Sequence, residues 1–530
     1  MPRFAHGSVA TPQQLQDAQR DLASRTADLD LGFVVAGPAA LQDFDFLFPE
    51  LQDDQANLLP TSADTLRRLK ELGRTMQDPG GPDPGDADIP AIYTYFGQFV
   101  DHDITPEASS FTTAKLLARN MAPLALDTIR DELKNLRTAT LELDSLYGPP
   151  APRDPANRNR LLLGRVTPLG GTEIPALRPK GKGDDNDLPR EPRSDDITHD
   201  RAARIGDPRN DENLIVGQLH LAFLKAHNRL VGQGRTFAQA RRLLRQHYQH
   251  IVIHDFLRRV ADPKVVDRIL QRGNRWYDAL AEPFFLPLEF TVAAFRFGHT
   301  MVRDDYDFNV NFNRSGQPGA SPATLDFLFT FTALSGQLGE FDTLPDNWII
   351  EWEHFVDTGA GAANQARRID TKLADGLFHL RNLEGAEEQP FDAARLAVRN
   401  LLRGYGLRMP TGQAVAKHLR LKALKAKEIE AAAASPQQAR VLRDAGFLER
   451  TPLWYYLLAE AKHPDGGDGQ RLGPVGSTIV AEVLIGLVRR SQDSILRTAG
   501  WTPSLPATHP SRFELADLLR FARVLPDSTR

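Results

Sequence analysis

Apolar residues recur every three or four positions along most of this chain, with polar residues between them. This period matches one face of an α-helix, whereas the strict alternation of a half-buried strand is rare and short. The clearest helical segments are residues 63–76, 214–231, 236–261, 422–434 and 479–488. The pattern therefore predicts a mainly α fold with only a few short β-hairpins.

Two stretches interrupt the helical pattern. Residues 78–88 (DPGGPDPGDAD) are rich in turn-forming residues, and residues 167–200 combine several prolines with charges of both signs. No clear linker follows residue 90. We therefore expect an N-terminal extension and linker over residues 1–89 and one large helical domain over residues 90–530.

Composition narrows the possible functions. The 530 residues are 41% hydrophobic and 25% charged, which is enough apolar material for a large core. The formal net charge of -5 gives no sign of binding to nucleic acid or to an anionic membrane. The chain has no cysteine, which excludes disulfides, thiolate metal ligands and a cysteine nucleophile.

We expect neither a secretory signal nor a membrane-spanning segment. Its first residues lack the apolar stretch of a secretory signal. The most apolar segment, residues 479–488, is too short to cross a bilayer and contains Glu482, so it predicts a buried helix. We expect a cytoplasmic protein, with secretion by another route left open.

Residues 93–107 (YTYFGQFVDHDITPE) contain the most informative polar group. Gln98, Asp101 and His102 stand at i, i+3 and i+4, so a helix would place an amide, a carboxylate and an imidazole on one face. A neutral imidazole can accept a proton, and an amide can hold a small ligand or water. The alternative is a solvated helix face with a capping aspartate.

Two further segments carry candidate chemistry. In GDPRNDEN (residues 206–213), Arg209 and Glu212 are three positions apart at the start of a long apolar helix. A local ion pair at a helix N-terminus is the alternative there. In FTVAAFRFGHTMVR (residues 290–303), His299 lies in a nearly apolar helix with Arg296 one turn before it. It is either a metal ligand or a hydrogen-bonded core residue.

Together these segments resemble the animal-type haem peroxidases of the peroxidase–cyclooxygenase superfamily. The matching motifs are FGQFVDHD, LELDSLYG, GDPRNDEN with the following HLAFLKAHNRL, AFRFGHTMVR and RNLLRG, in the family's order. The resemblance implies a haem b enzyme that reduces hydrogen peroxide through a ferryl intermediate. The electron donor would be a small molecule: a phenol, an aromatic amine, a halide or thiocyanate. The sequence leaves the donor and the oligomeric state open.

On the distal side of the haem, the resemblance assigns three catalytic residues. His102 would take a proton from peroxide and return it to the leaving oxygen. Arg209 would stabilise negative charge as the O–O bond breaks. Gln98 would order peroxide, water or halide.

On the proximal side, His299 would be the iron ligand. Asn400 would accept a hydrogen bond from the other nitrogen of that ring. Arg296 and Arg403 would pair with the haem propionates.

The resemblance also implies covalent links to the haem and a calcium ion. Asp101 and Glu212 match the two carboxylates that form esters to haem methyl groups. Asn213 follows Glu212 where methionine would be needed for an additional sulfonium link, so we do not expect that link. The calcium ligands would be Asp103, Thr138, Thr140, Glu142 and Asp144. The family usually has aspartate where Glu142 stands, and a solvated turn is the alternative.

Three rival functions stay open. A non-haem metal enzyme would use His247, His250 and His254, which stand at i, i+3 and i+7 of one predicted helix. A non-enzymatic haem-binding or adhesion module would keep the fold without the chemistry. A fatty-acid dioxygenase of the same superfamily would need a radical-forming tyrosine three residues before the proximal histidine, and that position is Arg296.

Overall fold

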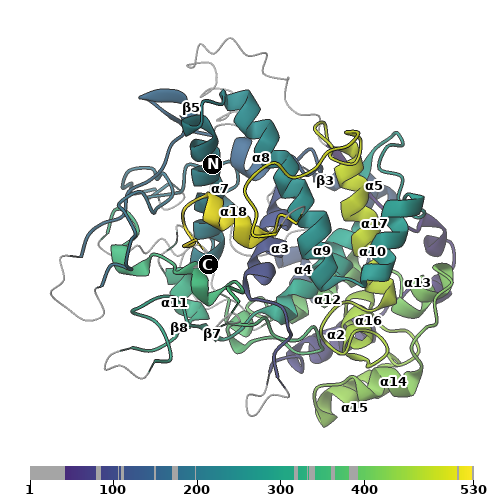
Figure 1. Ribbon diagram of the computed structural model, residues 1–530. Coiled ribbons are helices and arrows are strands. Elements are labelled where there is room, and N and C mark those ends of the chain that lie inside the picture. Colours follow the sequence, from purple (N-terminus) through teal and green to yellow (C-terminus); the bar gives the residue numbers. More distant parts are fainter. Residues whose placement is uncertain are drawn as a thin grey trace.

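The computed structural model describes fourteen stretches of the chain, which together contain all the elements discussed below. These stretches are residues 42–78, 85–105, 107–108, 113–135, 137–148, 151–169, 177–196, 199–315, 320–330, 332, 341–359, 364–380, 392–509 and 512–527. Helices dominate them, and the strands are short (Figure 1). The predicted mainly α fold is therefore confirmed.

The longer α-helices are α2 (Ala63–Arg74), α3 (Ile92–Ile104), α7 (Leu214–Gly232), α8 (Phe237–Ile251), α10 (Pro263–Arg272), α12 (Leu396–Gly406), α16 (Leu453–Lys462) and α17 (Pro474–Arg490). The shorter ones are α4 (Thr113–Leu117), α5 (Leu126–Glu132), α6 (Asp144–Tyr147), α9 (Leu257–Val260), α11 (Leu325–Thr330), α13 (Gly412–His418), α14 (Ala426–Ala431), α15 (Pro436–Asp444) and α18 (Leu515–Phe521).

The strands form one four-stranded sheet and two hairpins. The sheet has the order β2 (Glu107–Ala108), β3 (Lys134–Asn135), β1 (Gln42–Asp45) and β6 (Phe285–Pro287). Strand β1 pairs with β3 in antiparallel and with β6 in parallel orientation. The hairpins are β4 (Arg153–Asp154) with β5 (Asn157–Leu161), and β7 (Asp305–Tyr306) with β8 (Ala323–Thr324).

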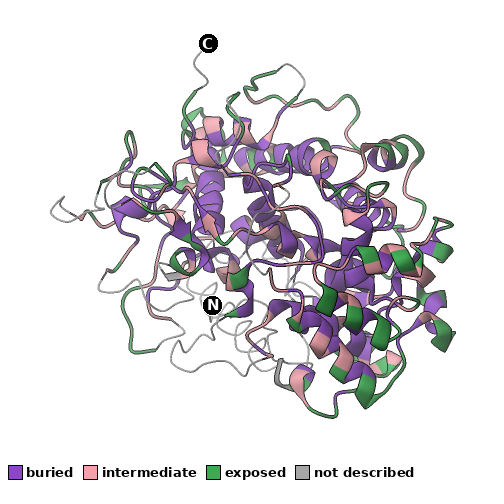
Figure 2. Ribbon diagram, turned by 90° about the horizontal axis from the view of Figure 1, so that it is seen from below, coloured by how far each residue is buried: buried purple, intermediate pink, exposed green. Residues whose placement is uncertain are grey.

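Helices α3, α7, α8 and α17 form the interior. Helix α3 packs on α7, and α7 packs on α8. Nearly every residue of α17 is buried, as expected for residues 479–488. Figure 2 shows the buried interior helices, with exposed residues gathered on the outer ones. In the described part of the chain, no helix has both the length and the apolar character needed to cross a bilayer.

The predicted helix over residues 236–261 is one continuous run with a change of pitch. Helix α8 passes into a π-helical turn (Val252–Phe256) and then into α9. Thr236 caps its start in a capping box with Gln239. The expected helix over residues 422–434 is shorter than the pattern indicated, because α14 spans only Ala426–Ala431. Ser435 and Pro436 then begin α15, since proline fits the first turn of a helix.

The segment around His299 differs from the expected α-helix. It begins as a π-helical turn (Glu289–Ala293) and continues as a 3₁₀-helix (Ala294–Met301). The side chain of Arg296 donates from Nε to the carbonyl of Thr291 at 3.0 Å. The buried carboxylate of Glu289 accepts from the backbone N–H groups of Leu47 and Phe48, which anchors the segment to the chain after β1.

Part of the expected N-terminal extension belongs to this same core. Phe44, Phe46 and Phe48 are buried. Helix α2 packs closely along α12, and its buried face includes Leu66, Leu69 and Leu72. Residues 1–41 and 79–84 lie outside the described residues, so the predicted boundary at residue 90 stays a prediction.

We expect Gly73→Ala to destabilise the protein at the contact of α2 with α12. A Cβ at Gly73 would lie 2.8 Å from the Cα and the amide nitrogen of Val398, and backbone cannot move aside cheaply. Overpacking of this kind costs about 1–3 kcal/mol. Urea unfolding followed by circular dichroism would measure it. Gly404→Ala, on α12, is the matched control, because its nearest atom is a Met409 side-chain carbon at 3.7 Å. Equal stability of both variants would contradict the prediction.

Candidate functional site

Three elements meet around His102. Helix α3 carries Gln98, Asp101 and His102, and it packs against the 3₁₀ turn Pro208–Asp211 and against α7. The turn brings Arg209, and Glu212 follows it. Asp207 caps the turn by accepting from the N–H of Arg209, as short polar side chains do at helix starts.

His102 is buried and belongs to a chain of three polar side chains. Its Nδ1 lies 2.8 Å from Oδ1 of Asn210. The Nδ2 of Asn210 lies 2.9 Å from Nδ1 of His220, on α7. An amide nitrogen only donates and an amide oxygen only accepts. Nδ1 of His102 therefore carries the proton, and its Nε2 presents a lone pair.

The charge state of His102 follows from its surroundings. Burial lowers the pKa of His102, and the nearby Arg209 guanidinium lowers it further, while the Glu212 carboxylate partly opposes both effects. A lowered pKa keeps the imidazole neutral at neutral pH. His102 is therefore equipped to accept a proton at Nε2.

Gln98 and Glu212 lie close to His102, whereas the side chain of Asp101 contacts Thr105. The amide nitrogen of Gln98 donates to Oε1 of Glu212, and that same Oε1 is 3.8 Å from Nε2 of His102. Asn213, which caps α7, donates from Nδ2 to Oε1 of Gln98 at 3.2 Å. The carboxylate of Asp101 faces the Thr105 hydroxyl at 3.4 Å.

Arg209 connects the turn to the end of α3. Its guanidinium forms a two-pronged pair with Asp207, through Nε at 3.0 Å and Nη2 at 2.7 Å. Nη2 also donates to the backbone carbonyls of His102 and Thr105. Arg137 reaches Asp207 from the other side at 2.8 Å. The two guanidinium groups hold the pKa of the buried Asp207 well below its usual range, despite its burial.

His299 contacts Asn400 as predicted, but the hydrogen bond runs in the opposite direction. Nδ2 of Asn400 lies 2.9 Å from Nδ1 of His299, so the amide donates to the ring instead of accepting from it. The physical reason is Arg296, whose Nη1 donates to Oδ1 of Asn400 at 2.9 Å and fixes the amide. Arg403 is buried on the same helix as Asn400, α12.

Four of the five predicted calcium ligands gather beside α3. The carboxylate of Asp103 accepts from the N–H groups of Leu143 and Ser145, both at 3.1 Å. Burial and the neighbouring Asp144 carboxylate raise the pKa of Asp103 to about 7. The Thr138 hydroxyl lies 2.7 Å from Asp144 and 3.0 Å from the Thr140 hydroxyl.

Glu142, the fifth predicted ligand, does not join them. Its Oε2 is 3.0 Å from Nη1 of Arg245, and its Oε1 accepts from the N–H of Gln492 at 2.6 Å. Across the residues that the structure describes, no three or more His, Cys, Asp or Glu side chains form a group that could hold a metal ion.

One histidine of the rival metal site, His247, is held by hydrogen bonds within the fold. His247 donates from Nδ1 to the carbonyl of Leu243 at 2.8 Å, and its Nε2 accepts from the N–H groups of Ser504 and Leu505. Both ring nitrogens are therefore engaged, and no lone pair is left for a metal.

Comparison with known proteins decides the family. The sequence model described as "Animal haem peroxidase" matches residues 128–482, more than half of the chain. The chain belongs to the animal haem peroxidase family. A "Peroxidase-like protein" of Margaritifera margaritifera is 28% identical over 330 residues. That alignment covers 54% of this chain but only 39% of the relative, so the chain spans about two fifths of its length.

Solved structures share the peroxidase fold at low sequence identity. Peroxidase A from Dictyostelium discoideum is 17% identical, with a TM-score of 0.53 over 80% of this chain and 83% of that one. Fatty acid α-dioxygenase from Arabidopsis thaliana is 13% identical, with a TM-score of 0.51 over 88% and 74%. A variant of the Oryza sativa fatty acid α-dioxygenase, solved with palmitic acid, is 15% identical, with a TM-score of 0.50 over 81% and 74%. These likenesses concern the fold alone.

Membership of the animal haem peroxidase family implies a bound haem, and the residues around His299 fit one. A Cβ added to Gly298 would meet no atom within 4 Å, so space is open beside the ring. Gln98, Asp101, Arg296 and His299 all keep partial exposure although most of their neighbours are buried. A flat group between α3 and the 3₁₀-helix would cover these side chains.

The sequence interpretation missed the residues that orient the predicted ones. Asn210 and His220 lie inside the matched motifs, but only the fold brings His220 back to Asn210. Asp207 and Asn213 are typical helix-capping residues, which was the available signal.

We expect Asp207→Asn to destabilise the protein by about 3 kcal/mol at pH 7, because it leaves the mostly buried guanidinium groups of Arg137 and Arg209 without their carboxylate. A carboxylate with a lowered folded-state pKa contributes stability above its unfolded-state pKa of about 3.9, and this contribution disappears as the pH falls through the folded-state value. The stability difference between wild type and variant should therefore be constant from about pH 5 to pH 8 and shrink below about pH 4. Urea unfolding across that range would measure it, and a difference that grows on acidification would contradict it.

Proposed function

We propose that this protein is a haem peroxidase that reduces hydrogen peroxide and oxidises small donors. The observation that carries the proposal is the neutral, buried His102, whose Nδ1–H is fixed by Asn210 and whose Nε2 lone pair is free to accept a proton. Family membership supports an oxidoreductase of this kind. The donor class stays open among phenols, aromatic amines, halides and thiocyanate.

The haem would be held between α3 and the Ala294–Met301 segment, with Nε2 of His299 on the iron. Bound haem would supply the redox-active iron that receives the oxidising equivalents of peroxide. Ligation of the iron through Nε2 would require a proton on Nδ1 of His299. Asn400 can accept a hydrogen bond from that Nδ1–H only if its amide group flips, so that Oδ1 faces the ring. Arg296 would release Asn400 by pairing with a propionate, and Arg403 would pair with the other.

On the distal side, His102 would take the proton of the peroxide oxygen that approaches the iron. It would then return this proton to the outer oxygen, which leaves as water. Arg209 would stabilise the negative charge that develops on the leaving oxygen. Its Nη1 makes one long hydrogen bond, to Thr105 at 3.4 Å, so a donor remains for that role. Gln98 would hold the peroxide or a donor through its amide.

Asp101 and Glu212 would form the ester links to the haem. Glu212 is buried beside His102, which supports a position near the distal face of the haem. Asp101 is partly exposed one turn after Gln98 on α3, and its carboxylate would turn away from Thr105 to reach the haem. We propose that turnover with peroxide forms these links.

The fatty-acid dioxygenase alternative is the weaker candidate. Phe295, Arg296 and Phe297 precede His299, and none of them is a phenol that could pass an oxidising equivalent to an acyl chain. Arg296 bonds to the carbonyl of Thr291 and to the amide oxygen of Asn400, and in the proposed site both groups would lie beside the haem.

The test is peroxide-driven oxidation of guaiacol or bromide by the haem-loaded protein. We expect His299→Ala to lose the normal Soret band together with the activity. His102→Ala should keep haem and react with peroxide about 10²–10⁴-fold more slowly in stopped flow, because general acid–base help is worth that much. Unchanged rates in His102→Ala would remove His102 from the mechanism. Sustained oxygen uptake with a fatty acid and negligible guaiacol or bromide turnover would favour a dioxygenase.

Asn210 would act as a positioning residue through His102. We expect Asn210→Ala to slow the peroxide step by about 10–100-fold, as the loss of groups that orient an imidazole typically does. Asn210→Asp keeps the acceptor but adds negative charge, which raises the pKa of His102. The acidic limb of its pH–rate profile should therefore move to higher pH. An unmoved limb, together with a wild-type rate in Asn210→Ala, would limit Asn210 to packing.

We propose a calcium ion bound by Asp103, Asp144, Thr138 and Thr140, without the carboxylate of Glu142. The buried carboxylate of Asp103 and the half-buried carboxylate of Asp144 are close enough to repel each other, which favours a cation between them. Asp144→Asn should abolish both the bound calcium in metal analysis and the drop in melting temperature caused by a chelator. Glu142→Gln is the control: it should lower stability through Arg245 but keep the calcium. Loss of calcium in Glu142→Gln would place that carboxylate among the ligands.

A further inference from the structure

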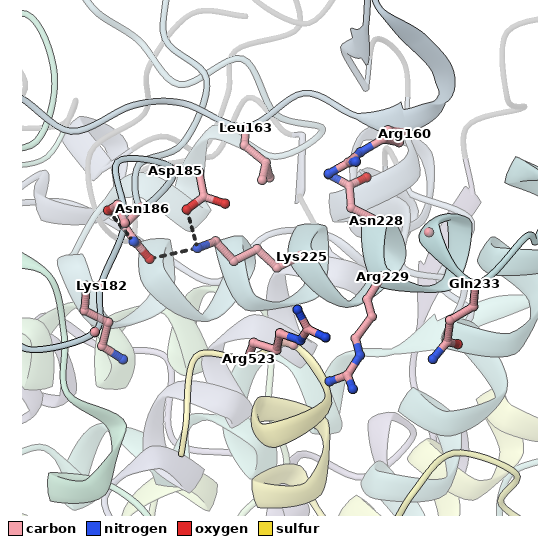
Figure 3. A pocket seen from close by; sticks show the side chains of 14 residues that line it. Arg160, Leu163, Lys182, Asp185, Asn186, Lys225, Asn228, Arg229, Gln233 and Arg523 are labelled. Carbon is pink, nitrogen blue, oxygen red and sulfur yellow. Dashed lines mark hydrogen bonds and ion pairs between the residues drawn. The ribbon is translucent and has the colours of Figure 1, made fainter. Parts of the chain in front are cut away.

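A second site lies on the far part of α7. A surface pocket of about 510 Å³ opens between the C-terminal half of α7, residues 181–186 and the end of α18 (Figure 3). Five basic residues line it: Arg160, Lys182, Lys225, Arg229 and Arg523. Asp185 is the one carboxylate in the lining of this basic pocket.

Three of the five cations have ordinary structural partners. Lys225 donates to Asp185 at 3.2 Å and to Asn186 at 2.9 Å. Arg229 donates to the carbonyl of Phe521 at 2.5 Å, and Lys182 donates to that of Val524 at 2.6 Å. Cations commonly satisfy the last carbonyls of a helix in this way. These contacts hold the three side chains at the pocket wall.

Arg523 has no such partner. Within the described residues, its side chain makes no hydrogen bond and no ion pair, although Figure 3 shows it beside Arg229. Burial lowers the pKa of Arg229 most, the neighbouring Arg523 guanidinium lowers it further, and the Asp527 carboxylate opposes both effects. Asp527 therefore compensates this pair of arginines only in part.

The backbone holds Arg523 in place. Its N–H bonds to the carbonyl of Arg520, and the N–H of Val524 bonds to that of Leu519, which is the Schellman ending of a helix. Arg523 has a φ of 59° at the position where glycine is usual. An arginine in this conformation is held at the rim of the basic pocket.

Arg160, at the opposite side of α7 in Figure 3, is also poorly compensated. Its Nε is buried without a hydrogen-bond partner within the described residues. The nearest ion pair is with Asp154 at 4.0 Å. Arg160 and Arg523 therefore both have unused hydrogen-bond donors, and they line a pocket that also contains three other cationic side chains.

We propose that the basic pocket binds a small, multiply charged oxyanion. Guanidinium groups match the oxygens of phosphates and carboxylates with paired hydrogen bonds. The volume falls in the range of about 300–1,000 Å³ that is typical of small-ligand sites. Phosphate and carboxylate anions share the chemistry that this pocket would recognise.

The basic pocket is separate from the candidate active site. Arg229 lies sixteen residues after Asn213, which is about 24 Å along α7 at 1.5 Å per residue. None of its basic residues takes part in the proposed peroxidase chemistry. The proposal can therefore fail or succeed independently of the proposed function.

The test is calorimetric titration of the full chain with inorganic pyrophosphate and, separately, with citrate, at low ionic strength adjusted with KCl. We expect saturable binding of at least one anion, weakened by added salt. Arg523→Gln and Arg160→Gln should each weaken it at least tenfold. Arg272→Gln is the matched control for Arg523→Gln, because Arg272 is also exposed at a helix end, in the last turn of α10, but lies outside the pocket.

The two anions distinguish the source of the ligand: tighter binding of pyrophosphate indicates a phosphate compound, and tighter binding of citrate a polycarboxylate. Both anions also chelate calcium, but a chelation effect would persist in the arginine variants. Absence of binding, or binding that both arginine variants retain, would overturn the proposal. Melting curves without anion would verify that each variant is folded.

Discussion

The ion pair between Asp207 and Arg209 holds together the region on which the candidate site depends. The last carbonyls of a helix have no partner within it, and Arg209 supplies donors to two such carbonyls at the end of α3. Asp207 fixes the guanidinium and also caps the turn that precedes α7. Through Arg137, the same carboxylate reaches the loop before α6. The end of α3, the turn and this loop are thus tied to one buried charge.

This arrangement sets both the position and the charge of His102. Arg209 donates a hydrogen bond to the carbonyl of His102. The backbone of His102, and with it the imidazole, therefore cannot shift without breaking the ion-pair network. The positive charge of Arg209 also lowers the pKa of His102, so the residue that would stabilise the leaving oxygen keeps the base neutral as well. Asp207 compensates the Arg209 charge and allows it to remain buried.

The sequence predicted the family, the mainly α fold and the helices that carry the site. Long apolar periodicity and the order of the motifs can both be recognised from the sequence alone. The start of α7 could be read from Asn213 and the preceding acidic residues. The change from a π-helical turn to a 3₁₀-helix before His299 could not be predicted from the sequence. Glu289 in that turn is bonded to the chain after β1, over 240 residues earlier. The packing of residues 42–78 into the core was missed for the same reason. Glu142 was expected beside Asp144 from the family resemblance, but its carboxylate pairs with Arg245, about one hundred residues later.

The contact of Asn210 with His220 shows how a buried amide can set the state of a distant ring. His220 is fully buried, and burial lowers its pKa to about 3, so it is neutral. Its Nδ1 accepts from Asn210, which places its own proton on Nε2, where no hydrogen-bond partner exists within the described residues. An unsatisfied buried donor costs about 1–3 kcal/mol. The fold tolerates this cost at His220, and the result is that the oxygen of Asn210 faces His102. Had the amide the opposite orientation, Nδ1 of His102 would accept, and Nε2 would carry a proton instead of the lone pair that a base requires.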